Sequence, residues 1–206
     1  MLRLTTGLGL RQGEVFGLAV EDVDFLRRTV HVRRQVAIVG SRLVFALPKG
    51  RKEREVPLPT SVANALATHL QAFPAQKVSL PWEKPSGSSV GAALILTSRE
   101  GKALNRNYIN PQVWKPALRR AGLPDDRTQG MHAGRHFYAS VQLEAGTSIR
   151  ALAAYLGHSD PGFTLRIYTH LMPEAEDKAR RAVDCVFDRL DDAVNGPLDG
   201  ARVSQM

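Results

Sequence analysis

The sequence has 206 residues, a single cysteine at position 185 and few aromatic residues. One cysteine excludes an intrachain disulfide and a zinc site built from several cysteines, and it favours a reducing compartment. No apolar run reaches the roughly 18 residues of a membrane-spanning helix, and the start lacks the pattern of a secretory signal. We therefore expect a cytoplasmic protein.

Acidic residues are fewer than basic ones, 20 against 28, which gives a net charge of +8. The excess of positive charge lies before Pro173, and the remaining C-terminal stretch is acidic. Such a balance favours a polyanionic partner, either nucleic acid or an anionic membrane surface. Basic clusters that could contact phosphates, or could be plain solvated surface, lie at 27–28, 33–34, 49–54 and 119–120.

The hydrophobic pattern predicts an α+β fold that is mainly α-helical, with a small three-stranded antiparallel sheet packed against the helices. One domain is expected over residues 1–192, followed by a tail over 193–206 that has no periodicity and is expected to be disordered. Residues 74–91 hold three prolines and predict a long loop. The predicted helices are 12–20, 60–73, 107–121, 132–145, 148–156, 161–168 and 173–190, and the predicted strands are 29–36, 42–47, 54–58 and 94–96.

Several polar residues occupy positions where structure alone does not require them. They lie at helix starts, at a turn between strands, after a glycine that ends a helix and ten residues beyond that position. The set is Arg11, Glu14, Lys49, His132, Arg135, His136, His158 and Tyr168. Guanidinium groups match phosphate oxygens and bind more strongly as negative charge develops at phosphorus. This set therefore predicts a site for a phosphodiester.

Metal binding and nucleotide hydrolysis would need other residues. His132 and His136 have the spacing of zinc ligands, but no His-Glu-x-x-His motif and no nearby cysteine accompany them, so no metal site is expected. Grouped carboxylates for magnesium and a Walker loop are also missing from the sequence. Taken alone, Arg11 with Glu14 is equally consistent with an ion pair at a helix start, and Tyr168 with an ordinary half-buried tyrosine.

The order of five motifs along the chain is more informative than any one of them. They are TGLGLRQGEVFGL at 6–18, PKGRKEREVPL at 48–58, HAGRHF at 132–137, LGHS at 156–159 and YTH at 168–170. Together they resemble the catalytic domain of the tyrosine recombinases, the phage integrase family, over about residues 5–190. The resemblance implies an enzyme that cleaves and rejoins duplex DNA.

The resemblance implies that Tyr168 is the nucleophile, which attacks a backbone phosphate and forms a 3′-phosphotyrosine with release of a 5′-hydroxyl. Since the phosphotyrosine stores the energy of the broken bond, no cofactor is expected. Arg11 and Arg135 would hold the non-bridging oxygens of the transition state. A tyrosine that titrates near pH 10 would need the positive neighbourhood of these residues.

The resemblance also implies roles for the remaining five residues. Lys49 would protonate the departing 5′-oxygen as the general acid, and His132 would assist proton transfer. His158 would hydrogen-bond a phosphate oxygen. Glu14 would orient Arg11 or the nearby helices, and His136 is expected to have a structural role.

The implied partners are double-stranded DNA and further copies of the chain, assembled as a tetramer on DNA. The predicted helix over 173–190 would pack either on a neighbouring protomer or on its own domain. Relatives carry an additional N-terminal DNA-clamping domain, so we expect a truncated reading frame or a remnant without the clamp. Relatives also often have leucine where this chain has Gly134, and the missing side chain is expected to loosen the helix start by about 1 kcal/mol.

Three functions remain open at this point. The first is a site-specific recombinase or integrase, and the second is a catalytically silent remnant that binds DNA without cutting it. The third is a strand-swivelling topoisomerase with the same chemistry but no synapsis. The motif style and short chain favour a recombinase over a topoisomerase, and the intact set of residues favours an enzyme over a remnant.

Overall fold

The computed structural model describes residues 1–126, 128–169, 180 and 183–185. The chain divides into two compact units, Met1–Leu171 and Met172–Met206. The helix expected over 173–190 lies mostly outside the described residues, although Arg180 and Val183–Cys185 are helical, and the tail expected over 193–206 lies wholly outside them. Among the described residues, no helix is long and apolar enough to span a membrane.

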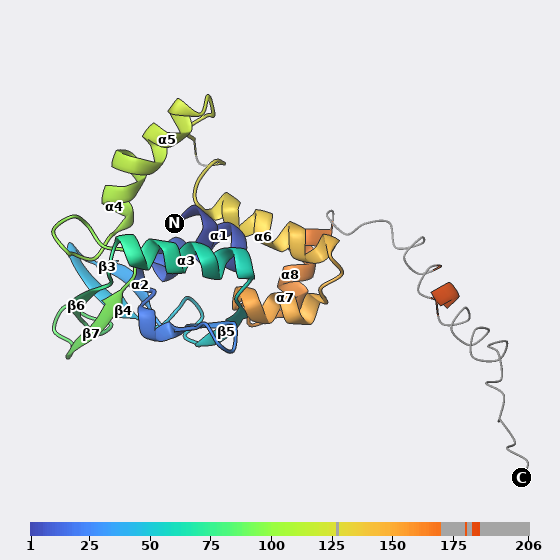
Figure 1. The fold of residues 1–206 in the computed structure, drawn as a ribbon, viewed down its shortest axis with the longest axis horizontal. Helices are drawn as coiled ribbons and strands as arrows, with labels where there is room; N and C mark the ends of the chain where they lie inside the picture. Colours follow the sequence, from blue (N-terminus) through green and yellow to red (C-terminus); the bar gives the residue numbers. More distant parts are fainter. Residues whose placement is uncertain (127, 170–179, 181–182, 186–206) are drawn as a thin grey trace, which may run out of the picture. The chain divides into compact units, whose positions relative to one another are not determined.

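Four predicted helices of the first unit agree closely with the structure (Figure 1). They are α3 Thr60–Ala72, α6 His132–Glu144, α7 Ile149–Leu156 and α8 Pro161–Tyr168. Local chemistry fixes the ends of α7 and α8. The Ser148 side chain accepts from the Ala151 N–H at the start of α7, Gly157 ends α7 at φ 65°, and the Asp160 side chain accepts from the Gly162 N–H at the start of α8.

The N-terminal segment is more helical than its sequence pattern predicts. It forms α1 Leu2–Leu8, α2 Gln12–Gly17 and a 3₁₀ turn, η1, at Val20–Asp22, so the predicted helix over 12–20 ends three residues early. Gly9 ends α1 at φ 63°, and a Cβ atom there would lie 2.5 Å from Cδ1 of Tyr138. Glycine at this position therefore lets α1 turn tightly into the segment that carries Arg11.

The antiparallel sheets confirm the fold class but not the predicted strand membership. The three-stranded sheet has the order β1-β2-β5, formed by Val23–Asp24, Thr29–Val32 and Arg54–Pro57. The predicted strand over 29–36 is instead split, and β3 Gln35–Val39 pairs with β4 Arg42–Ala46 in a separate hairpin. The split falls where the Arg34 side chain turns to Asp22, at 2.7 Å.

The predicted loop over 74–91 is wrong, because β6 Gln76–Pro81 pairs with β7 Ser89–Leu94. Alternation of Val78 and Leu80 on one face supports this strand. Its proline lies at the last position, where a missing N–H costs little. Only Leu94 of the strand predicted at 94–96 belongs to β7.

The helix predicted over 107–121 is continuous but irregular. It comprises α4 Arg106–Ile109, a π-helical stretch, η2, at Asn110–Trp114, and α5 Lys115–Arg120. Pro111 and Pro116 lack the N–H that regular α-helical bonding needs, which explains the change of helix type. Ile109 and Leu118 are buried as predicted, whereas Val113 is 41% exposed. This arm projects from the body of the unit (Figure 1).

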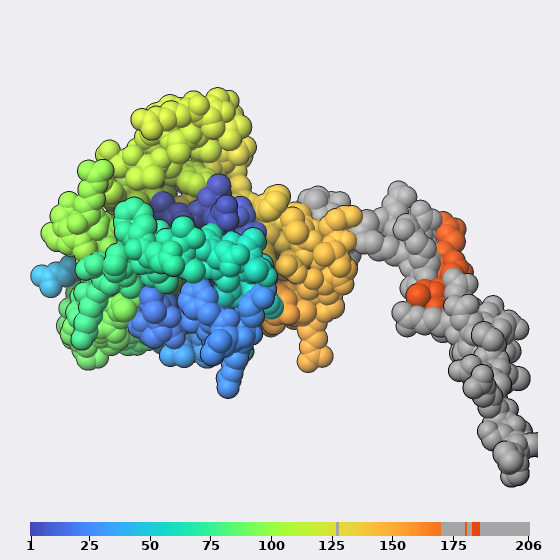
Figure 2. All heavy atoms as spheres, in the orientation of Figure 1, coloured from blue at the N-terminus to red at the C-terminus, as the bar shows by residue number. Residues whose placement is uncertain are grey.

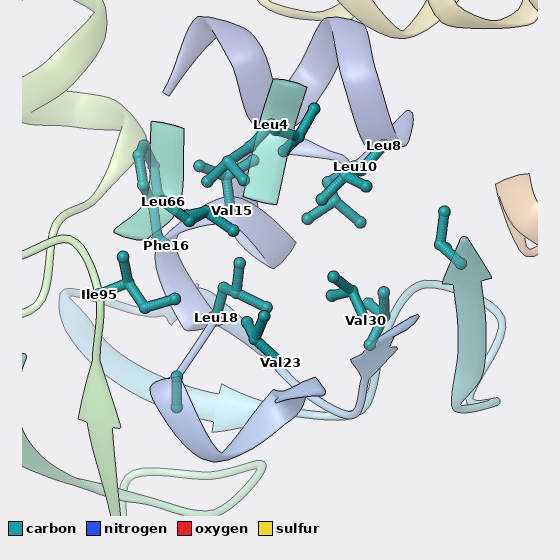
Figure 3. Close-up of a cluster of buried hydrophobic side chains, with 14 of the residues drawn as sticks. Leu4, Leu8, Leu10, Val15, Phe16, Leu18, Val23, Val30, Leu66 and Ile95 are labelled. Carbon is teal, nitrogen blue, oxygen red and sulfur yellow. The ribbon is translucent and has the colours of Figure 1, made fainter. Parts of the chain in front are cut away.

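The hydrophobic core surrounds the N-terminal segment. Figure 3 shows Leu4 and Leu8 of α1 and Val15 and Phe16 of α2 gathered with Leu66 of α3. Figure 2 shows the atoms of α3 next to the dark blue atoms of α1, which α3 contacts. The core therefore fixes the α1–α2 junction, from which Arg11 extends.

Gly134 allows α1 to pack closely on α6. A Cβ atom at Gly134 would lie 2.5 Å from Oγ1 of Thr5, and Thr6 is also within contact distance. Thr5 itself is fully buried. Gly134 therefore leaves no empty space, because α1 occupies the place of a larger side chain.

Candidate active site

All six residues predicted to act on a phosphodiester line one pocket of about 370 Å³: Arg11, Lys49, His132, Arg135, His158 and Tyr168. They come from the start of α2, a loop, the start of α6, the α7–α8 junction and the end of α8. Lys49 does not lie at the tip of a hairpin, because the strands that flank it, β4 and β5, belong to different sheets. Its loop nevertheless brings it to the pocket.

A buried carboxylate lies behind Arg11. Glu14 is 1% exposed and accepts hydrogen bonds from the Arg11 backbone N–H at 2.9 Å and from Arg11 Nη1 at 3.1 Å. Arg54 donates two hydrogen bonds to the same carboxylate, from Nη1 at 3.0 Å and from Nη2 at 2.6 Å. Its Nε donates to the Tyr155 carbonyl at 2.7 Å. Arg54 thus joins β5, α2 and α7 beneath the pocket.

Opposing effects set the pKa of Glu14. Burial by itself raises the pKa of this carboxyl, but the hydrogen bonds and charges of Arg54 and Arg11 outweigh burial and lower the pKa below its ordinary value. Glu14 is therefore an anion that holds two guanidinium groups. Its two contacts with Arg11, to the backbone N–H and to Nη1, fix where the Arg11 side chain begins and where it points.

Arg54 belongs to one of the basic clusters for which the sequence allows either phosphate contact or plain solvated surface. The structure places it in an internal ion pair instead, with only 7% of its side chain exposed. A signal for this is present in the sequence, because Arg54 and Val56 alternate on one face of β5 and Val56 is buried. A charged residue on the inner face of a strand needs a buried partner.

Arg135 is buried and tied to three parts of the fold. Its Nη1 donates to the Gly9 carbonyl at 2.6 Å, and its Nη2 donates to the Leu156 carbonyl and to His158 Nε2, the latter at 3.1 Å. Burial, followed by the charge of Arg11, lowers the pKa of Arg135 to about 9, so the side chain remains a cation at neutral pH.

The contacts of His158 define its tautomer. Arg135 can only donate, so Nε2 of His158 is the acceptor and the proton of the neutral ring lies on Nδ1. Nδ1 then donates to Oγ1 of Thr164 at 2.7 Å. Burial, with the charges of Arg135 and Arg11, lowers the pKa of His158 to about 4, so the ring is neutral at physiological pH.

The lowered pKa of His158 predicts a pH-dependent stability. Because histidine in an unfolded chain titrates near pH 6.5, the unfolded state binds more protons than the folded state between about pH 6.5 and about pH 4. The free energy of unfolding should therefore be at its full value above about pH 6.5 and fall as the pH is lowered through this window. Urea denaturation across the window measures this.

His158→Gln provides the control for this effect. It should give a shallower dependence on pH, with a residual slope because the pKa values of His132 and His136 are lowered in the same direction. Parallel curves for the two proteins would contradict the assignment to His158.

Tyr168 contacts His136, a residue expected to have only a structural role. The Tyr168 hydroxyl lies 3.0 Å from His136 Nδ1, and the tyrosine is 2% exposed. The rings of His136 and His132 meet edge to face, with centroids 4.7 Å apart. The spacing of the two histidines, one helical turn apart, already placed them on one face of α6.

The electrostatics of Tyr168 differ from the expectation. Burial raises the pKa of the phenol above its ordinary value, and the guanidinium groups of Arg135 and Arg11 offset only part of this rise. Burial also lowers the pKa values of His132 and His136, with help from nearby positive charges. Without DNA the site therefore holds a protonated phenol beside neutral imidazoles and fixed guanidinium cations.

Other basic clusters also serve the fold. Arg28 donates to the Leu58 carbonyl and to Thr60, and Arg34 pairs with Asp22. Among the described residues, no three His, Cys, Asp or Glu side chains are grouped as metal ligands would be. The pocket lining combines three cationic side chains and three imidazoles with Tyr168, the carboxylate of Asp160 and the apolar side chains of Phe163 and Ile167.

Two guanidinium groups, a lysine and imidazoles lie around a phenol in one pocket, and groups of these kinds can bind a phosphate anion. The model of the phage integrase family matches residues 1–175, and the chain belongs to this family. The motif resemblance seen in the sequence is thereby confirmed.

The chain is similar in sequence to tyrosine recombinases from several bacteria. The chain is 31% identical to a tyrosine recombinase XerC-like protein of Caldanaerobacter subterraneus subsp. tengcongensis, over 89% of this chain and 48% of the relative. It is 34% identical to tyrosine recombinase XerD of Staphylococcus epidermidis, over 83% of this chain and 49% of the relative. The chain thus spans about half the length of these relatives.

Solved structures share the fold. The Tn1549 transposon integrase in complex with circular intermediate DNA matches 90% of this chain and 58% of its own, with a TM-score of 0.69 and 23% identity. XerA recombinase matches 87% of this chain and 55% of its own, with a TM-score of 0.57 and 23% identity. The α+β class predicted from the sequence is confirmed.

Proposed function

We propose that this chain is a site-specific recombinase or integrase that cleaves and rejoins duplex DNA through a 3′-phosphotyrosine at Tyr168. The observation that carries the proposal is the shared pocket, where the Tyr168 phenol lines the same space as Arg11 and Arg135. Membership of the phage integrase family supports it, as does a transposon integrase of the same fold bound to DNA.

In the proposed reaction, Oη of Tyr168 attacks phosphorus and the bond from phosphorus to the 5′-oxygen breaks. Arg11 and Arg135 stabilise the charge on the non-bridging oxygens. Lys49 gives a proton to the departing 5′-oxygen, and His132 assists proton transfer. Attack of the 5′-hydroxyl of a second strand reverses these steps and releases Tyr168, so no cofactor is consumed.

His158 needs a change of protonation to bind phosphate. In the DNA-free tautomer its Nε2 is an acceptor, which cannot donate to a phosphate oxygen. A bound phosphate raises the pKa of nearby imidazoles and draws Arg135 toward its own oxygens. His158 can then carry a proton on Nε2 and donate it to the phosphate.

The proposal extends to domain boundaries, partners and location. Residues 1–192 form the catalytic domain, which acts on double-stranded DNA as a homotetramer during strand exchange. The single cysteine and the DNA substrate support a cytoplasmic location.

Covalent capture on DNA of randomised sequence tests the function whatever the target site is. The protein is incubated in EDTA with nicked duplexes that have a randomised centre, and adducts are separated on a denaturing gel. The wild-type chain should form an adduct whose DNA can be sequenced, and Tyr168→Phe should form none, because only the hydroxyl attacks phosphorus.

Two results would count against the proposal. An adduct that persists in Tyr168→Phe would show that another residue is the nucleophile. Salt-sensitive DNA binding with no adduct from the wild-type chain would support a silent DNA-binding remnant instead.

A further inference from the structure

We propose that His136 is the general base that accepts the proton of Tyr168 during DNA cleavage. This inference rests on the proposed function and assigns a chemical role to a residue that the family motifs left as structural. Its basis is the 3.0 Å contact between the Tyr168 hydroxyl and His136 Nδ1. A heavy-atom distance of this size lies within the reach that a general base requires.

The geometry separates His136 from the other imidazoles of the pocket. The ring centroids of His136 and Tyr168 are 5.6 Å apart. The ring of His132 packs against His136 instead, with centroids 4.7 Å apart. His158 is engaged at both nitrogens, by Arg135 and by Thr164. Within the described part of the chain, His136 is thus the imidazole that meets the phenol directly.

The charge states suit this direction of proton transfer. Burial and the charge of Arg135 lower the pKa of His136, so the ring is neutral at physiological pH. In the tautomer with the proton on Nε2, the Nδ1 lone pair accepts the hydrogen bond that the phenol donates. The buried phenol does not ionise by itself, because its own pKa is raised. The proton must therefore leave as the oxygen–phosphorus bond forms, which is the situation where a positioned base accelerates a reaction.

The proposed step is balanced. The Tyr168 oxygen forms its bond to phosphorus, its proton moves to Nδ1 of His136, and the 5′-oxygen leaves with a proton from Lys49. The resulting imidazolium lies beside the negatively charged phosphorus centre, where its charge is stabilising. On rejoining, the same proton returns from His136 to the Tyr168 oxygen.

The first test removes the base and then supplies it from solution. His136→Ala should lower the single-turnover rate of adduct formation by about 100-fold or more, measured on a duplex recovered from the covalent capture. Added imidazole should restore part of this rate, since a small base can occupy the vacated space. His31→Ala is the matched control, because it removes a partly exposed imidazole that does not line the pocket, and it should leave the rate unchanged.

The second test changes the acidity of the nucleophile. With 3,5-difluorotyrosine in place of Tyr168, the phenol needs less help to lose its proton, so the rate deficit of His136→Ala should shrink. A structural role would give the same deficit with either phenol. Thermal unfolding of each variant shows whether the fold is retained.

The outcomes distinguish this inference from the proposed function. Absence of any adduct with the wild-type chain overturns the function on which the inference rests. Adduct formation at the wild-type rate in His136→Ala overturns the inference alone. A deficit that imidazole does not relieve and that fluorination leaves unchanged also overturns it.

Discussion

Replacing Arg135 with lysine is expected to slow DNA cleavage by about 100- to 1,000-fold and to lower the free energy of unfolding by about 3 kcal/mol. The guanidinium reaches the Gly9 carbonyl, the Leu156 carbonyl and His158 at the same time. A lysine ammonium lacks the planar fork that satisfies such separated partners. At least one buried acceptor would lose its donor, and the transition state would lose part of the charge stabilisation proposed for Arg135.

Urea denaturation and the rate of adduct formation measure the two parts of this prediction. Arg150→Lys makes the same chemical change on an exposed residue of α7 and should alter the stability by less than about 0.5 kcal/mol. If Arg135→Lys is as stable as the wild type, the three hydrogen bonds do not hold the site together. If it cleaves DNA at the wild-type rate, the fork at Arg135 has no special role in charge stabilisation.

The sequence predicted best those parts that depend on neighbouring residues. The helices α6, α7 and α8 each show a 3.6-residue pattern, and α7 ends at a glycine that adopts the left-handed conformation. Motif order also predicted which distant side chains meet, and the pocket contains all six of them. These features depend on short stretches of sequence or on the order of the motifs along the chain.

Features that depend on non-local contacts were not predictable in the same way. The sequence over 29–36 alternates continuously and so predicts one strand. In the structure the Arg34 side chain bonds to the Asp22 carboxylate, 12 residues earlier, and the strand is interrupted there. Two prolines, at positions 74 and 81, predict a loop where the structure has β6. Pairing with β7 supplies hydrogen-bond partners for the backbone groups of β6. The helix α1 is short and is stabilised by packing on α6 and α3 rather than by its own pattern.

The site also depends on residues other than the six predicted to act on the phosphate, because non-local contacts bring these residues to it. The sequence indicates His136 only as a structural neighbour of Arg135 and Arg54 only as part of a basic cluster, yet His136 contacts the Tyr168 hydroxyl and Arg54 holds the carboxylate behind Arg11. Their roles arise from the meeting of α6 with α8 and of β5 with α2. Chemistry in this pocket is therefore inseparable from the packing of the elements beneath it.

Arg54→Met is expected to lower the free energy of unfolding by about 3–5 kcal/mol at neutral pH, because it leaves the buried Glu14 carboxylate with much less compensation. In the wild type the lowered pKa of Glu14 contributes stability above the ordinary pKa of the carboxyl, and this contribution is lost as the pH falls through the lowered value. In the variant burial dominates and raises the pKa of Glu14, so acidification neutralises the carboxyl and relieves the defect. The stability difference between the two proteins should therefore narrow as the pH is lowered.

A double substitution isolates the cause. Glu14→Gln in the Arg54→Met background removes the unpaired charge, so it should recover part of the lost stability, and the two single changes should not be additive. Arg51→Met is the matched control, since Arg51 pairs with Glu83 on the surface and its loss should cost less than about 1 kcal/mol. Additive losses, or a difference that stays constant from neutral to acidic pH, would mean that Arg54 stabilises the fold through its bond to Tyr155 and its packing rather than through the carboxylate behind Arg11.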